Sequence, residues 1–477
     1  MNLPRIKTYT SIALLLSSIA MTGCGSSSSD AGTTVSIGTK AYVEQNTELK
    51  GDFNEDVTLE AGKAYKITGE VNFRSGTTLT IPAGTTLYGS TPSSYLAINA
   101  GAKIDAQGTV DSPIIFTSAE DYNVRSTKDA QGEWGGLTII GKAPIHGGTK
   151  TYEAGTQVGG GNDAADNSGI LKYVIIKHTG YEVETDKELN GLSLLAVGSG
   201  TEISDIAVIG GADDGIEIWG GTVNLKNIYV YNAADDSLDT DSGYTGTIDN
   251  AVAVQKVVDK TNYDSSGIES GNDKDTYDVS PTGDAAPTMP TLKNATLNVI
   301  GGAIYIKNDS GYKFENVIVN TKPSTVSGQT DTADQAMVTL RTTDTVDDLS
   351  GNPYGITFNG LILNNEVNPE LIFAKRTAKD DSNGGNTTDQ FFTESYWLNN
   401  VDITTANVNY AGPLFVSATK TIDGTAIINE ASNKSTAART AVTGADQSVF
   451  DWVLKELNSV TNGVTLTVEA ETGTNQM

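Results

Sequence analysis

The chain has 477 residues, with 59 acidic against 31 basic side chains and a formal net charge of −28. This charge argues against nucleic acid and anionic membrane surfaces as partners, because phosphate groups would be repelled. With two histidines and one cysteine, the sequence excludes histidine-rich metal chemistry, cysteine-based zinc sites and intramolecular disulfides. The acidity suits a protein that lives among divalent cations outside the cytoplasm, and it equally suits a merely soluble surface.

The N-terminal residues 1–24 have a basic start, a short apolar run over 11–21 and the ending "MTGC". The apolar run is too short for a membrane span and predicts a secretion signal. The ending resembles the lipobox of bacterial lipoproteins, which implies that Cys24 carries the lipid anchor of the mature chain. The alternative is an ordinary cleaved signal with an incidental cysteine. Residues 25–40 are polar and predict a flexible tether, so we expect a lipid-anchored protein of the bacterial cell envelope, at the outer membrane or cell surface.

An Asn or Asp followed by an apolar-x-apolar pattern returns along the chain, at Asp205, Asn227, Asn294, Asn316 and Asn400. Two of these steps, from 205 to 227 and from 294 to 316, are 22 residues long. Nearer the N-terminus, the pattern that begins at Leu79 returns at Leu96, a step of 17, which predicts a shorter period of the repeat there. Short strands that repeat with turn residues between them, and with no helices, favour a parallel β-solenoid over a β-sandwich or propeller.

Several stretches resemble a set of poorly characterised bacterial surface lipoproteins, among them "SPIIFTSAED", "EWGGLTIIGKAPI" and "ADDGIEIWGGTVNLKNIYV". The resemblance runs from about residue 57 to about residue 420. Those proteins are similar to the right-handed parallel β-helices of the pectate-lyase type. The resemblance therefore implies an all-β chain with a single right-handed parallel β-helix, and it implies location more than activity.

We expect this β-helix over residues 41–425, with loop insertions such as 146–167 and 260–290. Residues 426–477 are expected to form a cap region with one short helix. Trp452 would fix this helix over an end of the solenoid, because solenoid ends need covering.

Acidic residues repeat with the same 22-residue step. Asp213 and Asp214 return as Asp235 and Asp236, and Glu217 returns as Asp239. In coils of 22 residues these carboxylates lie about 4.8 Å apart, where like charges repel by roughly 1 kcal/mol in water and by more at lower dielectric. Two kinds of interaction could offset this repulsion. Aspartates at tight turns accept hydrogen bonds from backbone N–H groups, or a hard cation, most simply Ca²⁺, bridges adjacent coils.

The calcium interpretation has the ligand set Asp213, Asp214, Glu217, Asp235, Asp236, Asp239 and Asp241. Neither the EF-hand spacing nor the glycine-aspartate nonapeptide of calcium-binding repeats is present. The prediction of calcium therefore depends on electrostatics and not on a motif.

An aspartate pair on a β-helix also resembles the inverting polygalacturonases, in which Asp235 and Asp236 would be the acid and the base, supported by Asp213 and Asp214. The Gly-His-Gly and Arg-x-Lys motifs of that family are missing here. A calcium-dependent polysaccharide lyase would instead need a lysine or arginine base. Lys177 and Lys226 are candidates by position, so no catalytic residue is assigned.

Four aromatic residues near the acidic repeat, Trp219, Tyr229, Tyr231 and Tyr244, are expected to point outward or to lie in turns. Exposed aromatics beside carboxylates suit the stacking of sugar rings, whereas loops that cover them would give them a structural role. The sequence thus predicts a surface protein that binds a glycan or a protein partner through an acidic, calcium-ordered face. The alternatives are a polysaccharide lyase or inverting glycoside hydrolase, and a passive structural surface protein.

Overall fold

The computed structural model of the chain describes residues 35–152, 155–184, 187–256, 266–272, 287–300, 302–307, 310–321, 338–342, 356–365, 373–377, 390–391, 408–410, 421–422, 425–426 and 443–459. The predictions for the signal segment, Cys24, most of the tether and Asn400 lie outside the described residues. The chain divides into the units Met1–Val35 and Ser36–Met477, and the fold below is that of the second. No helix in the described part of the chain has the length and apolar character needed to cross a bilayer.

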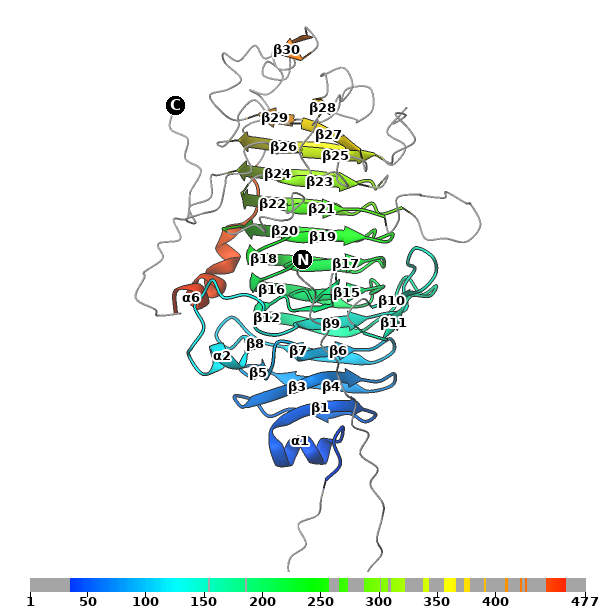
Figure 1. The fold of residues 1–477 in the computed structure, drawn as a ribbon, viewed down its shortest axis with the longest axis vertical. Coiled ribbons are helices and arrows are strands. Elements are labelled where there is room, and N and C mark those ends of the chain that lie inside the picture. The colour runs from blue at the N-terminus through cyan, green and yellow to red at the C-terminus, as the bar shows by residue number, and fades with distance from the viewer. Residues whose placement is uncertain are drawn as a thin grey trace, which may run out of the picture. The chain divides into compact units, whose positions relative to one another are not determined.

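The strands of this unit stack in parallel, coil on coil, and form three faces (Figure 1). The A face contains β2 (Val57–Thr58), β4 (Thr78–Pro82), β7 (Lys103–Gln107) and the first halves of β12 (Gly169–Thr179), β16 (Glu202–Gly211), β18 (Asn224–Ala233), β20 (Thr247–Val254), β22 (Thr291–Val299), β24 (Lys313–Thr321) and β26 (Thr357–Asn365). The B face contains the first halves of β1 (Glu48–Phe53) and β3 (Ala64–Phe73), then β5 (Thr86–Gly89), β8 (Ile114–Ser118), the second halves of the long strands β12 to β26, and β29 (Val408–Tyr410).

The C face contains the second halves of β1 and β3, then β6 (Tyr95–Ile98), β9 (Leu137–Ile140), β15 (Leu192–Leu195), β17 (Ile216–Trp219), β19 (Leu238–Asp241), β21 (Ile268–Ser270), β23 (Ile304–Lys307), β25 (Val338–Thr342) and β27 (Phe373–Thr377). The remaining elements are β28 (Gln390–Phe391), antiparallel to β27; the hairpins β10 (Lys150–Thr151) with β11 (Val158–Gly159), β13 (Glu182–Glu184) with β14 (Lys187–Glu188), and β30 (Thr421–Ile422) with β31 (Thr425–Ala426); and the helices α1 (Lys40–Asn46), α2 (Ala119–Tyr122), η2 (Gln447–Phe450) and α6 (Asp451–Ser459).

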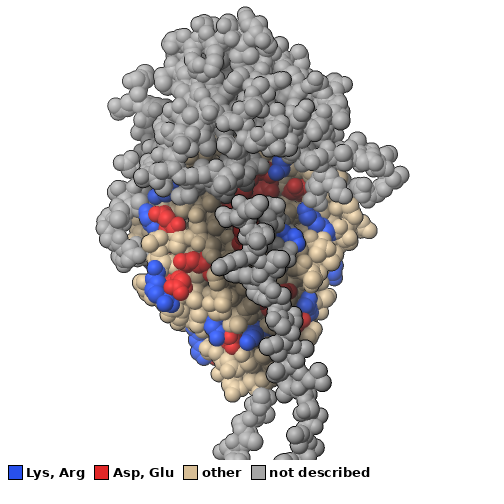
Figure 2. All heavy atoms as spheres, viewed as in Figure 1, with Lys and Arg blue, Asp and Glu red and all other residues tan. Residues whose placement is uncertain are grey.

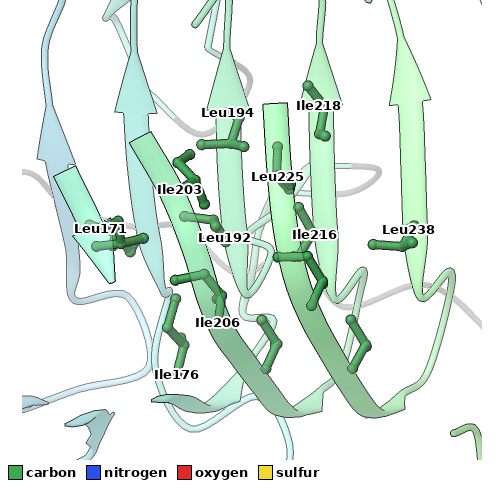
Figure 3. Close-up of a cluster of buried hydrophobic side chains, with 14 of the residues drawn as sticks. Leu171, Ile176, Leu192, Leu194, Ile203, Ile206, Ile216, Ile218, Leu225 and Leu238 are labelled. Carbon is green, nitrogen blue, oxygen red and sulfur yellow. The ribbon is translucent and has the colours of Figure 1, made fainter. Parts of the chain in front are cut away.

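Alternating apolar residues fill the interior of the coils. On the C face, Leu192, Ile216 and Leu238 occupy the same position in successive strands and are at most 1% exposed (Figure 3). Each buried side chain of this size stabilises the fold by about 1.5–3 kcal/mol, but only when the coils above and below cover it. The β-solenoid predicted from the repeats is confirmed.

A ladder of polar residues marks the bend between the A and B faces. At this position the chain adopts a positive φ, which Asn and Asp tolerate better than other non-glycine residues. The ladder residues are Asp205, Asn227, Asn250, Asn294 and Asn316, with φ between 50° and 64°. Amide groups donate to the residue one coil below, as Asn227 does to Asp205 (2.8 Å) and Asn316 to Asn294 (2.7 Å). This asparagine ladder explains the repeated Asn or Asp of the sequence.

The 17-residue period near the N-terminus is not the coil length, and that expectation was wrong. Leu79 pairs with Ile104 on the A face, whereas Leu96 pairs with Val71 and Leu137 on the C face. The repeated pattern arises because successive strand-turn-strand units have similar sequences although they lie on different faces. The step between stacked residues here is the 25 residues from Leu79 to Ile104.

The C-terminal helix α6 is present, but it does not cover an end of the solenoid. It packs with η2 along the outside of the B face, beside the middle coils (Figure 1). Trp452 is 5% exposed and its ring lies 5.6 Å from that of Tyr173, while Phe450 lies 5.4 Å from Tyr229. Trp452 therefore fixes the helix as expected, at a different place from the one expected.

Candidate functional site

The acidic repeat lies at the start of the C-face strands β17 and β19. Their register places Glu217 opposite Asp239 and Trp219 opposite Asp241. The next strand, β21, adds Glu269 opposite Asp239. The predicted 22-residue stacking of carboxylates is confirmed. Glu269 could not be predicted, because an insertion between β20 and β21 breaks the period.

Two groups of carboxylates come close enough to share a cation. Oxygen atoms of Asp213, Asp214 and Asp235 lie within 4.8 Å of one another, and we call these residues the first triad. Oxygen atoms of Asp214, Glu217 and Asp239 meet the same limit and form the second triad. Five of the seven predicted metal ligands are thus brought together, and Asp214 belongs to both groups.

The other two predicted ligands have different surroundings. Asp236 accepts hydrogen bonds from the backbone N–H and the hydroxyl of Ser266, the hydroxyl at 2.6 Å. Asp241 accepts from the hydroxyl of Ser242 at 3.2 Å. Neither residue is part of a triad.

One carboxylate oxygen of Asp214 also accepts a hydrogen bond within a turn. Its Oδ1 accepts a hydrogen bond from the backbone N–H of Asp236 at 2.8 Å, and the Oδ1 of Asn190 accepts from the N–H of Asp214 at 3.2 Å. Each turn therefore supports the next coil, as the turn interpretation requires. These hydrogen bonds leave the negative charges of the triads close together, so both interpretations apply to the same residues.

Burial makes these charges costly. Asp214, Asp236 and Asp239 are 6%, 3% and 7% exposed. Burial, and then the neighbouring carboxylates, raise the pKa of Asp214 and Asp236 well above the ordinary range. Burial also raises the pKa of Asp239 to about 7, although Lys307 opposes this shift. Oδ1 of Asp239 is buried with no hydrogen-bond partner in the described part of the chain, so it needs a proton or a cation.

A pH dependence follows from this burial. A carboxyl whose folded pKa is raised stabilises the fold below its unfolded pKa, and that stability is lost as the pH rises through the folded pKa. For Asp239 the window runs from 3.8 to about 7, at about 1.4 kcal/mol per pKa unit. With a chelator present, we expect the free energy of unfolding measured in urea to fall between pH 4.5 and 7.5 (roughly this window).

The variant Asp239→Asn should make this dependence less steep, and the slope that remains comes from Asp214 and Asp236, whose pKa values burial also raises. Burial opposes the ionisation of Glu48, yet Lys66, Thr68 and Tyr42 lower its pKa from 4.5 to about 2, so its contribution to stability increases up to about pH 4.5 and is constant above it. A free energy that stays constant or increases over the window in the wild type would contradict the prediction.

A basic residue faces the carboxylates from two coils away. Lys307, in β23, forms an ion pair with Glu269. The two lysines considered as bases from their positions lie elsewhere. Lys177 contacts Asp121 and Glu456 at the outside of the B face, and Lys226 lies on the A face in register with Asp249. Lys307 was missed because nothing in its local sequence marks it.

The expectation of exposed aromatic residues is wrong. The exposed fractions are 3% for Trp219, 4% for Tyr229, 1% for Tyr231 and 0% for Tyr244. Tyr229 and Tyr231 lie beneath η2 and α6, and Tyr244 lies in the interior, where its hydroxyl donates to the carbonyl of Val223 at 2.9 Å. Alternation gave the outward direction of Trp219, Tyr229 and Tyr231 but could not show what covers them, and it did not predict that Tyr244 points into the interior.

Residues of the insertion over 146–167 cover Trp219 and reach Ser242, the residue after Asp241. Tyr152 packs edge-on against Trp219, with ring centroids 5.9 Å apart. The N–H of His146 donates to the carbonyl of Ser242 at 2.8 Å, and Nζ of Lys150 lies 3.3 Å from the Ser242 hydroxyl. The hairpin of β10 and β11 therefore forms a wall beside Asp241.

On the face that Figure 2 shows, Lys and Arg side chains are interspersed with Asp and Glu over the N-terminal coils. Among the described residues, the two triads are the carboxylate groups close enough to share a cation, and Asp214 and Asp239 within them are buried.

Comparison with known proteins gives one match. A family model described as "Pectate-lyase like beta helix domain" matches residues 51–400. No curated protein and no solved structure matches the chain.

Proposed function

The chain belongs to the family of pectate-lyase-like β-helix domains, and from this premise we propose that it binds Ca²⁺ at its two carboxylate triads. The observation that carries the proposal is Oδ1 of Asp239, which is buried without a hydrogen-bond partner among the described residues. This carboxylate belongs to a group whose oxygen atoms lie within 4.8 Å of those of Asp214 and Glu217. A cation there would neutralise charges that the fold otherwise brings together at a cost.

The donor set suits calcium. The triads offer carboxylate oxygens without sulfur or imidazole ligands, and Ca²⁺ takes six to eight oxygens in flexible geometry. Asp213, Glu217 and Asp235 are partly exposed, so the triads can be reached from solvent and completed by water. Glu217 is also held in place by the amide of Asn190, at 2.6 Å.

In the cell, we propose, the cation orders a surface that binds a glycan or a protein partner. The hairpin of β10 and β11 lies beside Asp241, at the end of the strand that carries Asp239, and loops on a rigid solenoid commonly carry binding functions. The signal-like residues 1–24 support placement in the bacterial cell envelope through a lipid on Cys24.

A calcium-dependent polysaccharide lyase is the second candidate, and Lys307 is the observation that favours it. Such an enzyme needs a basic residue facing the carboxylates, and Lys307 approaches them through Glu269. An ammonium paired with a carboxylate holds its proton, which is the opposite of what a general base requires. Binding is therefore better supported than catalysis. An assay of ultraviolet absorbance that detects the release of unsaturated uronides in the presence of Ca²⁺ would instead favour the lyase.

The stoichiometry of calcium binding tests the proposal. We expect isothermal titration of the mature chain to give two Ca²⁺ ions per molecule. Asp239→Asn should retain the first triad and bind about one ion, whereas Asp214→Asn, which removes the shared ligand, should lose both.

The matched control is Asp105→Asn on the A face, whose partner is the amide of Gln107 at 2.7 Å. This variant should bind as the wild type does. If the wild type takes up no Ca²⁺, the aspartates serve the turns alone.

A further inference from the structure

A cavity of about 560 Å³ lies at the bend between the A and B faces, away from the triads of the C face. The asparagine ladder and Lys226 and Asp249 of the A face form one side. The chain just before η2 forms the other side, at Thr443–Asp446. The volume is within the range of about 300–1,000 Å³ that small-molecule sites occupy.

The asparagine ladder is interrupted at this cavity. Asn294 is stacked on Asn250, yet its amide donates to Oδ1 of Asp249 at 2.7 Å instead of to Asn250. The carbonyl oxygen of the Asn250 side chain accepts from the backbone N–H of Asp446 at 2.7 Å. The change of partners turns polar side chains toward the cavity at this coil step.

The opposite wall is held close to the coils. The backbone N–H of Thr443 donates to Oδ1 of Asn316 at 2.6 Å, and that of Ala445 donates to the hydroxyl of Thr296 at 3.0 Å. Gly444 has a φ of 67°, and a Cβ there would lie 2.4 Å from the same hydroxyl. Both walls are therefore fixed before any ligand arrives, which lowers the entropic cost of binding.

The groups that line the cavity restrict the ligand. Asp249 and Asp446 disfavour an anion. A cation finds no convergent carboxylates here, since the clusters found among the described residues lie on the C face. An apolar molecule would contact little besides Ala445 and Val449. What remains is a neutral molecule that is rich in groups able both to donate and to accept hydrogen bonds.

We propose that this cavity binds a neutral pyranose sugar through its hydroxyl groups, each of which can donate and accept. Lys226 is exposed and has no hydrogen bond or ion pair within the described part of the chain, so its ammonium can donate to the sugar. Asp249 uses Oδ1 for Asn294, and its Oδ2 can accept from a hydroxyl. The site requires neither the cation nor the loops of the proposed function.

Titration of the mature chain with methyl glycosides of neutral hexoses tests this proposal. Binding is measured by saturation-transfer NMR and by calorimetry, in a buffer that contains a chelator. The wild type should bind at least one glycoside. Asp249→Ala and Lys226→Met should each weaken binding about tenfold or more, because each removes a hydrogen bond to a charged group. The control is Lys293→Met, which should leave binding unchanged. Lys293 lies on the A face one coil beyond Asp249, and its ammonium is 3.6 Å from the carboxylate of Glu315.

Three results would overturn the proposal. The wild type could bind none of the glycosides, or both cavity variants could bind as the wild type does. Binding that requires Ca²⁺ and is lost in Asp239→Asn would place the sugar on the C face instead. Since the titration is done in a chelator, its failure is independent of the calcium proposal.

Discussion

Saturating Ca²⁺ is expected to raise the free energy of unfolding of chelator-treated protein by about 2.7 kcal/mol per site at a concentration 100 times the dissociation constant. With two triads the gain approaches about 5 kcal/mol, which is large against the usual net stability of a domain. The physical reason is that the folded state alone holds these carboxylates together. Urea unfolding at pH 7.5 with Ca²⁺ or with a chelator measures the gain directly.

Asp214→Asn separates the cation from turn chemistry. The amide oxygen of an asparagine can still accept the hydrogen bond from the N–H of Asp236, so the turn is kept. The variant removes the charge shared by both triads. We expect it to be more stable than the wild type in a chelator and to gain almost nothing from Ca²⁺. If it gains as much as the wild type, the cation is bound elsewhere.

The proximity of the triads could be predicted because it depends on period alone. Where coils have 22 residues, a residue number fixes a neighbour, and Glu217 does lie opposite Asp239. Insertions between strands remove this information. Asn250 follows Asn227 by 23 residues and Glu269 follows Asp239 by 30, so both were missed although they continue the ladder and the acidic column.

The predicted exposure of the aromatic residues was wrong for a different reason. Alternation along a strand determines whether a side chain points into or out of the coil, but covering depends on segments far away in the sequence. Trp219 points outward and is covered by the hairpin of β10 and β11, while Tyr231 is covered by residues more than 200 positions later. The same long-range packing determines where α6 docks, so its position could not be read from its own amphipathic pattern.

The docking of α6 gives the second large effect. Lys177 is 5% exposed and bridges Asp121, at 2.7 Å, and Glu456 of α6, at 2.8 Å. Burial opposes the ionisation of Asp121, yet His178, Lys177 and Thr117 hold the pKa of this carboxyl well below its usual value. Burial also opposes the charge of Lys177, and its two carboxylate partners nevertheless raise its pKa. The charges of Asp121 and Lys177 are therefore maintained by their neighbours in this bridge.

Lys177→Met should destabilise the protein by about 3–5 kcal/mol, because it leaves two largely buried carboxylates without their counter-charge. Lys172→Met is the matched control, because Lys172 is on the same strand but half-buried and has no ion pair among the described residues. It should cost at most about 0.5 kcal/mol. Adding Asp121→Asn and Glu456→Gln to Lys177→Met should recover much of the loss, since the uncompensated charges are removed.

Hydrogen exchange of the α6 amides locates the effect. If the bridge holds the helix on the B face, exchange over Asp451–Ser459 should accelerate in Lys177→Met and stay unchanged in Lys172→Met. Exchange of the C-face strand β17 should change less, because it does not contact the helix. Equal protection of α6 in both variants would mean that the apolar contacts of Phe450, Trp452 and Leu457 hold the helix without the ion pairs.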